Sequence, residues 1–291
     1  MEIRIPISFD AIVDEIIKFT GLPIDDVRHR VWMEVLNSGW NVCQDVERFQ
    51  VTPHKFDEKM INLYNNSYGF IFETMVFWAT LYRQKWPEHA LERLFVYARK
   101  TGVPPEKIRI LIFGDGTGND SLFLASKGFV INYYDIPGSK TFEFALKRFT
   151  EYKLHGNMIN VITDYNRIIS GQYDAIICFE VLEHLPDPKS FIRDLAGALK
   201  ENGIILITEA FGFVADSHPT HLSCNLKYVG LTPIIFKKNG LSLTWYAPLF
   251  KPMEFTKKKD SGMLATLWDI NIIKGLLVWL YRNIKNKLKK Y

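Results

Sequence analysis

The first hundred residues carry apolar side chains at spacings of three and four positions, which places those side chains on one face of a helix. Helices are predicted over residues 9–19, 24–36, 54–65, 70–84 and 88–101. Turn-forming sequences, GLP at 21–23 and NSG at 37–39, separate the first of them, and Pro104 and Pro105 end the region. We therefore expect a helical N-terminal region over residues 1–105.

Over residues 106–255 the pattern changes to short apolar and β-branched runs that alternate with helical stretches. The predicted strands are IRILIF (108–113), FVINYYD (129–135), NVITD (160–164), YDAIICF (173–179), GIILITEA (203–210) and LSLTWYA (241–247). Helices are predicted to begin near Asn119, Ser139, Asp187 and His221. Such alternation is typical of a parallel sheet covered on both faces. The sequence thus predicts an α/β domain with a doubly wound, Rossmann-like sheet.

The last segment, residues 256–291, is basic and amphipathic. Nine Lys and Arg against two Asp give it a charge of +7, so the rest of the chain carries −3 of the total of +4. The apolar residues that recur at three or four positions are Leu264, Leu267, Ile270, Ile273, Leu277, Leu280 and Ile284. Two interpretations stay open: an amphipathic helix lying on an anionic membrane, or a helix packed against the catalytic domain or a dimer partner.

Composition narrows the class of protein. With 291 residues and 47% hydrophobic content, the chain has enough apolar side chains for one large core or a core plus a smaller domain. The body is not basic, which argues against a nucleic-acid partner. Cys43, Cys178 and Cys224 are far apart and odd in number, so neither a disulfide framework nor a zinc site is indicated. No export signal or membrane span is recognised, and we expect a cytoplasmic protein, peripheral at the inner membrane face if the tail binds there.

Three glycines alternate in ILIFGDGTGND at 110–120, directly after the first predicted strand. Glycines at such a turn allow positive φ angles and close approach of the backbone to a ligand. At the carboxyl edge of an α/β sheet the expected ligand is a nucleotide. The dinucleotide fingerprint G-x-G-x-x-G fails in both registers, because Asn119 and Ser121 occupy the third-glycine positions.

The G-x-G-x-G loop resembles that of class I S-adenosylmethionine-dependent methyltransferases, of the type 11 and 23 kind that includes small-molecule and quinone-biosynthesis enzymes. FEVLEHLPDP at 179–188 and its flanking strands are similar to the same family. The resemblance covers about half of the chain and implies S-adenosylmethionine as the cofactor. The cofactor-binding residues that it implies are Gly114, Asp115, Gly116, Gly118, Asp135, Ile136, Asp164, Phe179 and Glu180.

Two of these residues have a specific role in the resemblance. Asp135 matches the acid that holds the ribose hydroxyls, and a carboxylate can accept from both hydroxyls at once. Asp164 matches the side chain that meets the adenine amine. The chain departs from the family at Ile112, where an acidic residue is usual, and Asp115 lies inside the loop instead.

Candidate bases follow the fourth and fifth strands. His184 lies in EHLPDP, where it is a base or part of the pocket wall; His218 and His221 follow Asp216. A histidine backed by a carboxylate titrates near neutral pH, which suits a base for methyl transfer. The alternatives are a metal site formed by Asp216, His218 and His221, substrate hydrogen bonding, or plain loop structure; we assign no metal.

The N-terminal helices are expected to form a lid over the acceptor, with an aromatic pocket formed by Phe70, Phe72, Phe77, Trp78 and Tyr82 or, alternatively, with these side chains in the core. The predicted function is methyl transfer to a small-molecule, saccharide or lipid-linked acceptor, with oxygen favoured over nitrogen and carbon. The alternatives are a nucleotide-binding oxidoreductase and a non-catalytic binding protein. A homodimer is also compatible with the sequence.

Overall fold

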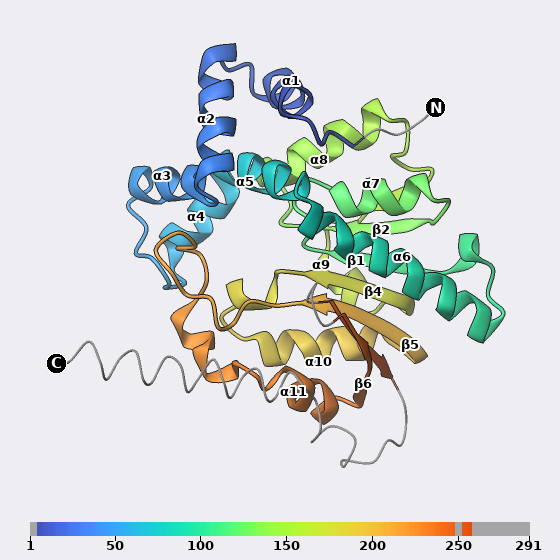
Figure 1. Ribbon diagram of the computed structural model, residues 1–291. Helices are drawn as coiled ribbons and strands as arrows, with labels where there is room; N and C mark the ends of the chain where they lie inside the picture. The colour runs from blue at the N-terminus through green and yellow to red at the C-terminus, as the bar shows by residue number, and fades with distance from the viewer. Residues whose placement is uncertain (1–4, 248–251, 258–291) are drawn as a thin grey trace.

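The computed structural model describes residues 5–247 and 252–257 (Figure 1). One seven-stranded sheet, in the order β3-β2-β1-β4-β5-β7-β6, runs through the centre of this part. Strands β1 to β5 pair with one another in parallel, whereas β7 is antiparallel to both β5 and β6. The α/β fold class predicted from the sequence is confirmed. The amphipathic positions from Leu264 onward lie outside the described residues.

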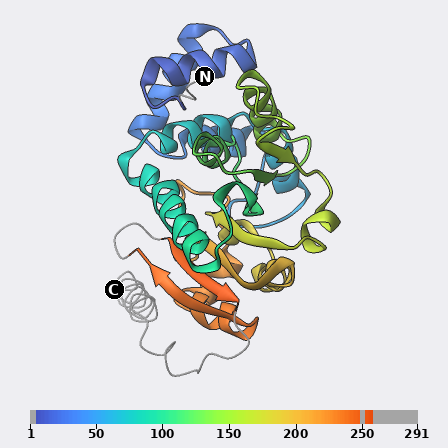
Figure 2. The same cartoon turned by 90° about the vertical axis from the view of Figure 1, so that its right-hand side faces the viewer.

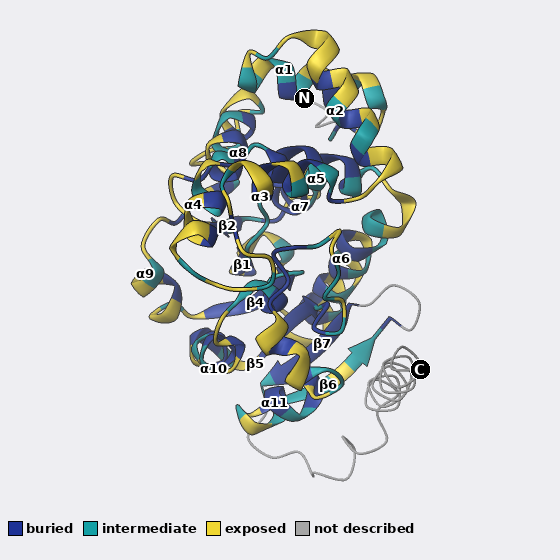
Figure 3. Ribbon diagram, turned by 90° about the vertical axis from the view of Figure 1, so that its left-hand side faces the viewer, coloured by how far each residue is buried: buried dark blue, intermediate teal, exposed yellow. Residues whose placement is uncertain are grey.

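The strands are short and their centre is fully buried. Their bounds are β1 Ile110–Phe113, β2 Ile131–Tyr134, β3 Ile159–Val161, β4 Tyr173–Phe179, β5 Leu199–Thr208, β6 Leu241–Tyr246 and β7 Met253–Lys257. Every residue of β4 is buried, as the dark blue of Figure 3 indicates. A strand covered on both faces is apolar throughout, which is why YDAIICF shows no alternation of polar and apolar positions.

Helices cover both faces of the sheet. One face packs against α6 Leu81–Thr101, α7 Asn119–Ser126 and α8 Lys140–Glu151; the other packs against α9 Tyr165–Ile169, α10 Pro188–Ala198 and α11 Thr232–Lys238. Figure 1 shows α10 and α11 on the side of the sheet opposite to α6 and α7. The first core contains Trp86, Leu94 and Phe129, and the second contains Phe191 and Phe236.

The remaining N-terminal helices form a layer at one end of the molecule. They are α1 Phe9–Thr20, α2 Ile24–Leu36, α3 Trp40–Arg48, α4 Glu58–Asn66 and α5 Gly69–Trp78. Figure 2 shows this layer at the end opposite to the antiparallel strands. Val13, Val31 and Phe72 pack together with Phe144 of α8, so the layer shares a core with the α/β domain. This packing places α4 and α5 over the carboxyl edge of the sheet.

The helix boundaries differ from the prediction at three places. The helix predicted over 54–65 begins only at Glu58. The predicted helix over 70–84 breaks at Ala79 and Thr80, where the Thr80 hydroxyl caps α6 by accepting from the Arg83 amide at 3.2 Å. Helix α6 then continues through Pro87 instead of ending before it. Burial of Trp86 and Leu94 against the sheet offsets the backbone hydrogen bond that Pro87 cannot donate.

Some elements were not predicted. Helices α3 and α9 and strand β7 were missed, and the helix expected near His221 is a 3-10 turn at Ser223–Tyr228 followed by α11. Strand β7 has no clear apolar pattern because Glu254, its second residue, is buried and paired with Arg93 of α6 at 2.8 Å. The division into regions 1–105, 106–255 and 256–291 stays a prediction, and β7 spans its second boundary.

Candidate active site

A cavity of about 870 Å³ lies at the carboxyl ends of β1, β2 and β4. This volume is within the range of small-molecule and cofactor sites, about 300–1,000 Å³. One wall consists of the glycine loop and the end of β2. The opposite wall consists of aromatic side chains from the N-terminal helices and the loop before α4: Phe56, Tyr64, Phe70, Phe77, Trp78, Tyr82 and Trp86. Of the five aromatic residues expected to line a pocket, Phe72 alone is absent from these walls and lies in the core.

The glycine loop has the backbone that only glycine tolerates without strain. Gly114 has a φ of 73°, and a Cβ atom there would lie 2.4 Å from Val181 Cγ2. Gly118 has a φ of 78°, and its Cβ would lie 2.5 Å from Phe149 Cζ. The loop therefore packs closely against the turn after β4 on one side and against helix α8 on the other. This close packing leaves the loop backbone exposed to the cavity, where a nucleotide could approach it.

Asp115 has a structural partner within the loop. Its carboxylate oxygens accept from the amides of Asp120 at 3.0 Å and Ser121 at 2.7 Å, which caps the start of α7. Burial, followed by the charge of Asp120, raises the pKa of Asp115 to about 7. Asp115 also lines the cavity. A cofactor contact by Asp115 stays a prediction, and each of its oxygens keeps a second lone pair that can accept a hydrogen bond.

Asp135 is buried where β2 ends and connects this strand end to the loop. One oxygen accepts from the Gly116 amide at 2.6 Å and the other from the Ile136 amide at 2.7 Å. Burial raises the pKa of Asp135, while these two amides act in the opposite direction. Asp135 and Ile136 both line the cavity. The ribose contact of Asp135 stays a prediction.

Asp164 lies differently from the other predicted cofactor residues. It is exposed and caps α9 by accepting from the Asn166 amide at 2.9 Å. Asp164 is not among the residues that line the cavity, whereas the adjacent Tyr165 is. A carboxylate after a strand often serves as a helix cap, and this is the role that the geometry gives Asp164.

Phe179 and Glu180 line the cavity at the end of β4. Glu180 has a φ of 51°, which is uncommon for a residue other than glycine. Its amide donates to the Thr208 hydroxyl at 2.9 Å, which ties the ends of β4 and β5 together. Strained backbone of this kind persists where surrounding contacts determine it, and it clusters at functional sites.

The three predicted histidines come together on one side of the cavity. The ring centroids of His184 and His221 are 4.8 Å apart, and those of His218 and His221 are 5.1 Å apart. His184 Nδ1 lies 3.0 Å from the Tyr64 hydroxyl and 3.2 Å from the Thr220 carbonyl oxygen. His221 Nδ1 lies 2.5 Å from the carbonyl oxygen of Phe213, to which it donates.

Both buried histidines are neutral near pH 7. Burial lowers the pKa of His184 to about 4 and that of His221 to about 3. At His221 the Nδ1 partner is the Phe213 carbonyl and not Asp216. His221 therefore presents an unprotonated Nε2, which is the form that can accept a proton. A pairing of Asp216 with His218 stays a prediction.

Three side chains beside the cavity could hold a metal ion, but they are not the three that the sequence suggested. Ligand atoms of Glu183, His184 and His221 all lie within 4.8 Å of one another. Asp216 and His218 do not belong to this set. Two histidines and a carboxylate are a ligand type that divalent transition metals accept.

Several residues of the site escaped the sequence analysis. Arg83 pairs with Asp120 through two hydrogen bonds of 3.0 and 2.6 Å and lies over the Trp86 ring. Arg148 of α8 donates to the Thr117 carbonyl at 2.6 Å and so supports the loop from below. Glu73 is the charged residue of GFIFETMVFW, the sequence of α5. A single charged residue in so apolar a helix could have indicated Glu73 as a functional residue.

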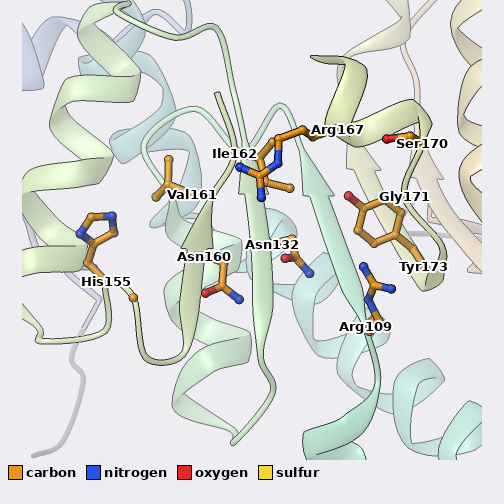
Figure 4. Close-up of a pocket in the computed structure, with 11 residues that line it drawn as sticks. Arg109, Asn132, His155, Asn160, Val161, Ile162, Arg167, Ser170, Gly171 and Tyr173 are labelled. Atoms are coloured by element: carbon orange, nitrogen blue, oxygen red, sulfur yellow. The ribbon is translucent and has the colours of Figure 1, made fainter. Parts of the chain in front are cut away.

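A second cavity, of about 660 Å³, lies on the sheet near the amino ends of β1 and β4. Figure 4 shows Arg109, Asn132, Asn160, Arg167 and Tyr173 around it. None of the predicted site residues lines this cavity. Ligands of open α/β sheets bind at the opposite, carboxyl edge, so the larger cavity is the candidate active site.

Comparison with known proteins identifies the domain. Residues 82–223 match the family model described as "Methyltransferase domain", which is just under half of the chain. The ubiquinone biosynthesis O-methyltransferase of Bordetella pertussis is 30% identical over 131 residues, which cover 42% of this chain and 51% of the relative. The enzyme of the same name from Marinobacter nauticus is 39% identical over 66 residues, covering 19% and 28%. The chain thus spans about half or less of the length of these curated relatives.

A solved structure, that of the CurJ carbon methyltransferase, shares the fold. It has a TM-score of 0.53 at 14% identity and covers 79% of this chain and 67% of that chain. The strand order 3-2-1-4-5-7-6 is typical of class I methyltransferases. The chain therefore contains a methyltransferase domain of the class that uses S-adenosylmethionine, and the resemblance stated from the glycine loop is confirmed.

Proposed function

We propose that this protein transfers a methyl group from S-adenosylmethionine to an oxygen atom of a small-molecule acceptor bound beneath the N-terminal helices. The observation that carries the proposal is the continuity of one cavity between the glycine loop with Asp135 and the aromatic wall with the histidines. The cofactor wall and the acceptor wall face the same space, as transfer between two bound molecules requires.

The cofactor supplies an electrophilic methyl group on a sulfonium, and the chain's own residues supply alignment and a proton acceptor. Asp135 and the glycine loop hold the nucleoside end of the cofactor. The neutral His221 takes the acceptor's hydroxyl proton on Nε2 while its Nδ1–H stays bonded to the Phe213 carbonyl. The new bond joins the acceptor oxygen to the methyl carbon, and the carbon–sulfur bond breaks.

Oxygen as the methylated atom follows from two sources of support. An alcohol or phenol carries its proton at neutral pH, so it benefits from a neighbouring neutral histidine. Both named relatives are O-methyltransferases by their titles. The aromatic wall favours an acceptor with apolar or aromatic surface over a bare saccharide.

The decisive experiment joins binding and transfer. Calorimetry with S-adenosylmethionine and with NAD tests the cofactor, and incubation with methyl-labelled S-adenosylmethionine and a pool of hydroxylated aromatic compounds tests transfer. We expect binding of S-adenosylmethionine without binding of NAD, and label in the organic extract as an ether. Binding of NAD alone would support an oxidoreductase; cofactor binding without any transfer would support a non-catalytic binding protein.

The basic tail gives a second, separable proposal about location. No helix of the described residues is long and apolar enough to cross a membrane. We propose that the part of this tail that follows β7, residues 258–291, binds an anionic membrane surface, on the evidence of its charge and apolar spacing. A chain ending near Asp260 should lose sedimentation with anionic vesicles yet still bind S-adenosylmethionine. Unfolding of the shortened chain would instead support packing of the tail against the protein.

A further inference from the structure

Glu73 places a carboxyl group in a wall that is otherwise largely aromatic. It lies on α5 between Phe72 and Thr74, and it lines the cavity. Thr74 is directed to the cofactor side, since its hydroxyl lies 3.3 Å from the Thr117 hydroxyl of the glycine loop. Glu73 Oε1 lies on the other side, near Gly39, at 3.6 Å from the Cβ position of that residue.

The Glu73 carboxyl differs from its acidic neighbours in having no hydrogen bond or ion pair with another described residue. The Glu34 carboxylate accepts from the amides of Gly39 and Asn41. The Asp45 carboxylate accepts from the Ser67 hydroxyl and the Gly69 amide. Glu73 is half-buried and lines the cavity, so its carboxyl is accessible from that space. A bound molecule in the cavity is the partner that the fold leaves room for.

The surroundings keep this carboxyl protonated. Burial, followed by the negative charge of Glu34 on α2, raises the pKa of Glu73 to about 8. Cys43 on α3 and Tyr64 on α4 also lie within electrostatic reach of Glu73, and burial raises the pKa of both. With its pKa raised to about 8, the Glu73 carboxyl is mostly protonated at pH 7 and can donate a hydrogen bond.

We propose that Glu73 is an acceptor-binding residue whose protonated carboxyl donates a hydrogen bond to an oxygen atom of the methyl acceptor. The inference rests on the proposed function, because it needs the acceptor to occupy this cavity. Glu73 holds the acceptor from the N-terminal wall, and His218 and His221 meet it from the loop at 213–221. The acceptor class is thus an apolar, aromatic molecule with an oxygen-bearing group.

The test uses 4-butylphenol as the probe and the full-length chain saturated with S-adenosylhomocysteine. Calorimetry compares the wild type, Glu73→Gln and Glu73→Ala at about pH 6.5 and about pH 9, on either side of the Glu73 titration. We expect Glu73→Gln to retain affinity within about threefold, because its amide donates as the neutral acid does, and Glu73→Ala to lose about tenfold. The wild type should bind more weakly at the higher pH, and Glu73→Gln should not.

The matched control is Glu58→Gln on the exposed surface of α4, which should leave probe affinity and its pH dependence unchanged. Three outcomes would overturn the assignment: no binding of 4-butylphenol by the wild type, equal affinity in all variants, or equal losses in the Gln and Ala variants. Tighter binding of 4-butylbenzylamine than of the phenol, lost in Glu73→Gln, would show recognition of a cation instead. Failure to bind S-adenosylhomocysteine would contradict the proposed function itself, which separates the two tests.

Discussion

The two walls of the cavity are built in contrasting ways. The cofactor wall comes from one stretch of chain between Gly114 and Ile136, in which the loop after β1, helix α7 and strand β2 follow each other. The acceptor wall joins segments far apart in the sequence: the His54 amide donates to the Pro219 carbonyl, and the Ser223 amide to the His54 carbonyl. A cofactor site on a class I sheet is thus a local property of the chain, whereas the acceptor site depends on long-range packing.

The largest expected effect concerns the histidines of the acceptor wall. Replacing His221 with Ala should lower turnover by about 10²- to 10⁴-fold, the usual contribution of a general base, with cofactor affinity nearly unchanged. His184→Ala should also lower turnover, because its ring packs on His221. His218→Ala should matter less, because His218 is less buried and its Nδ1 lies 2.9 Å from the Ser217 hydroxyl. Steady-state assays with the identified acceptor measure all three, and near-normal turnover in the triple variant would return the loop to a structural role.

On the cofactor wall, substitutions of Gly114 and Gly116 should lower the free energy of unfolding by different amounts. Gly114→Ala introduces a left-handed non-glycine residue and a clash with Val181, and we expect a loss of about 2–4 kcal/mol in the free energy of unfolding. Gly116→Ala is the matched control. The nearest atom to its Cβ position is Thr74 Cγ2 at 3.7 Å, so the left-handed backbone alone should cost about 1–2 kcal/mol. Equal losses in urea titrations would contradict the packing described for Gly114.

Asp135 and Asp164 both follow strands, and their Ala variants distinguish a ligand contact from a helix cap. Asp135→Ala should weaken S-adenosylmethionine binding by about 1.5–3 kcal/mol, the scale of charge-assisted hydrogen bonds. Asp164→Ala should change that affinity by less than about 0.5 kcal/mol, because Asp164 is exposed and bonded to the α9 amide. Calorimetry on both variants decides between the two positions. A larger loss at Asp164 would restore its predicted adenine contact.

Glu73 gives the smallest effect, a pH-dependent one. Its pKa is raised in the folded state from the usual 4.5 to about 8. The unfolded chain therefore loses this proton first, and the group's destabilising contribution grows as pH rises from 4.5 to 8. Glu73→Gln removes that contribution. Allowing for solvent in the cavity, we expect the variant to gain about 1–2 kcal/mol of stability at pH 8 and nothing near pH 4.5, by denaturant titration. A gain independent of pH would contradict the protonation described.

The same contrast explains what the sequence predicted. The α/β alternation, the glycine turn and Asp135 are local patterns, and all three are found where they were expected. Helix α3, the path of α6 through Pro87 and strand β7 depended on tertiary contacts, such as the Arg93–Glu254 pair across 161 positions. The pairing of His221 with the Phe213 carbonyl and the exposed placement of Asp164 also follow from packing, because several partners compete for each polar side chain.

One cavity holds the cofactor at the sheet edge and the acceptor beneath the N-terminal helices in the function proposed above. A crystal structure with bound S-adenosylhomocysteine is the most direct test of this shared cavity. We expect the ribose hydroxyls to bind Asp135 and the amino-acid part of the ligand to lie along Gly114 to Gly118. The sulfur atom should face the space between Glu73 and His221. A sulfur atom that faces away from this space, or a nucleoside bound in the cavity around Arg109 and Arg167, would contradict it.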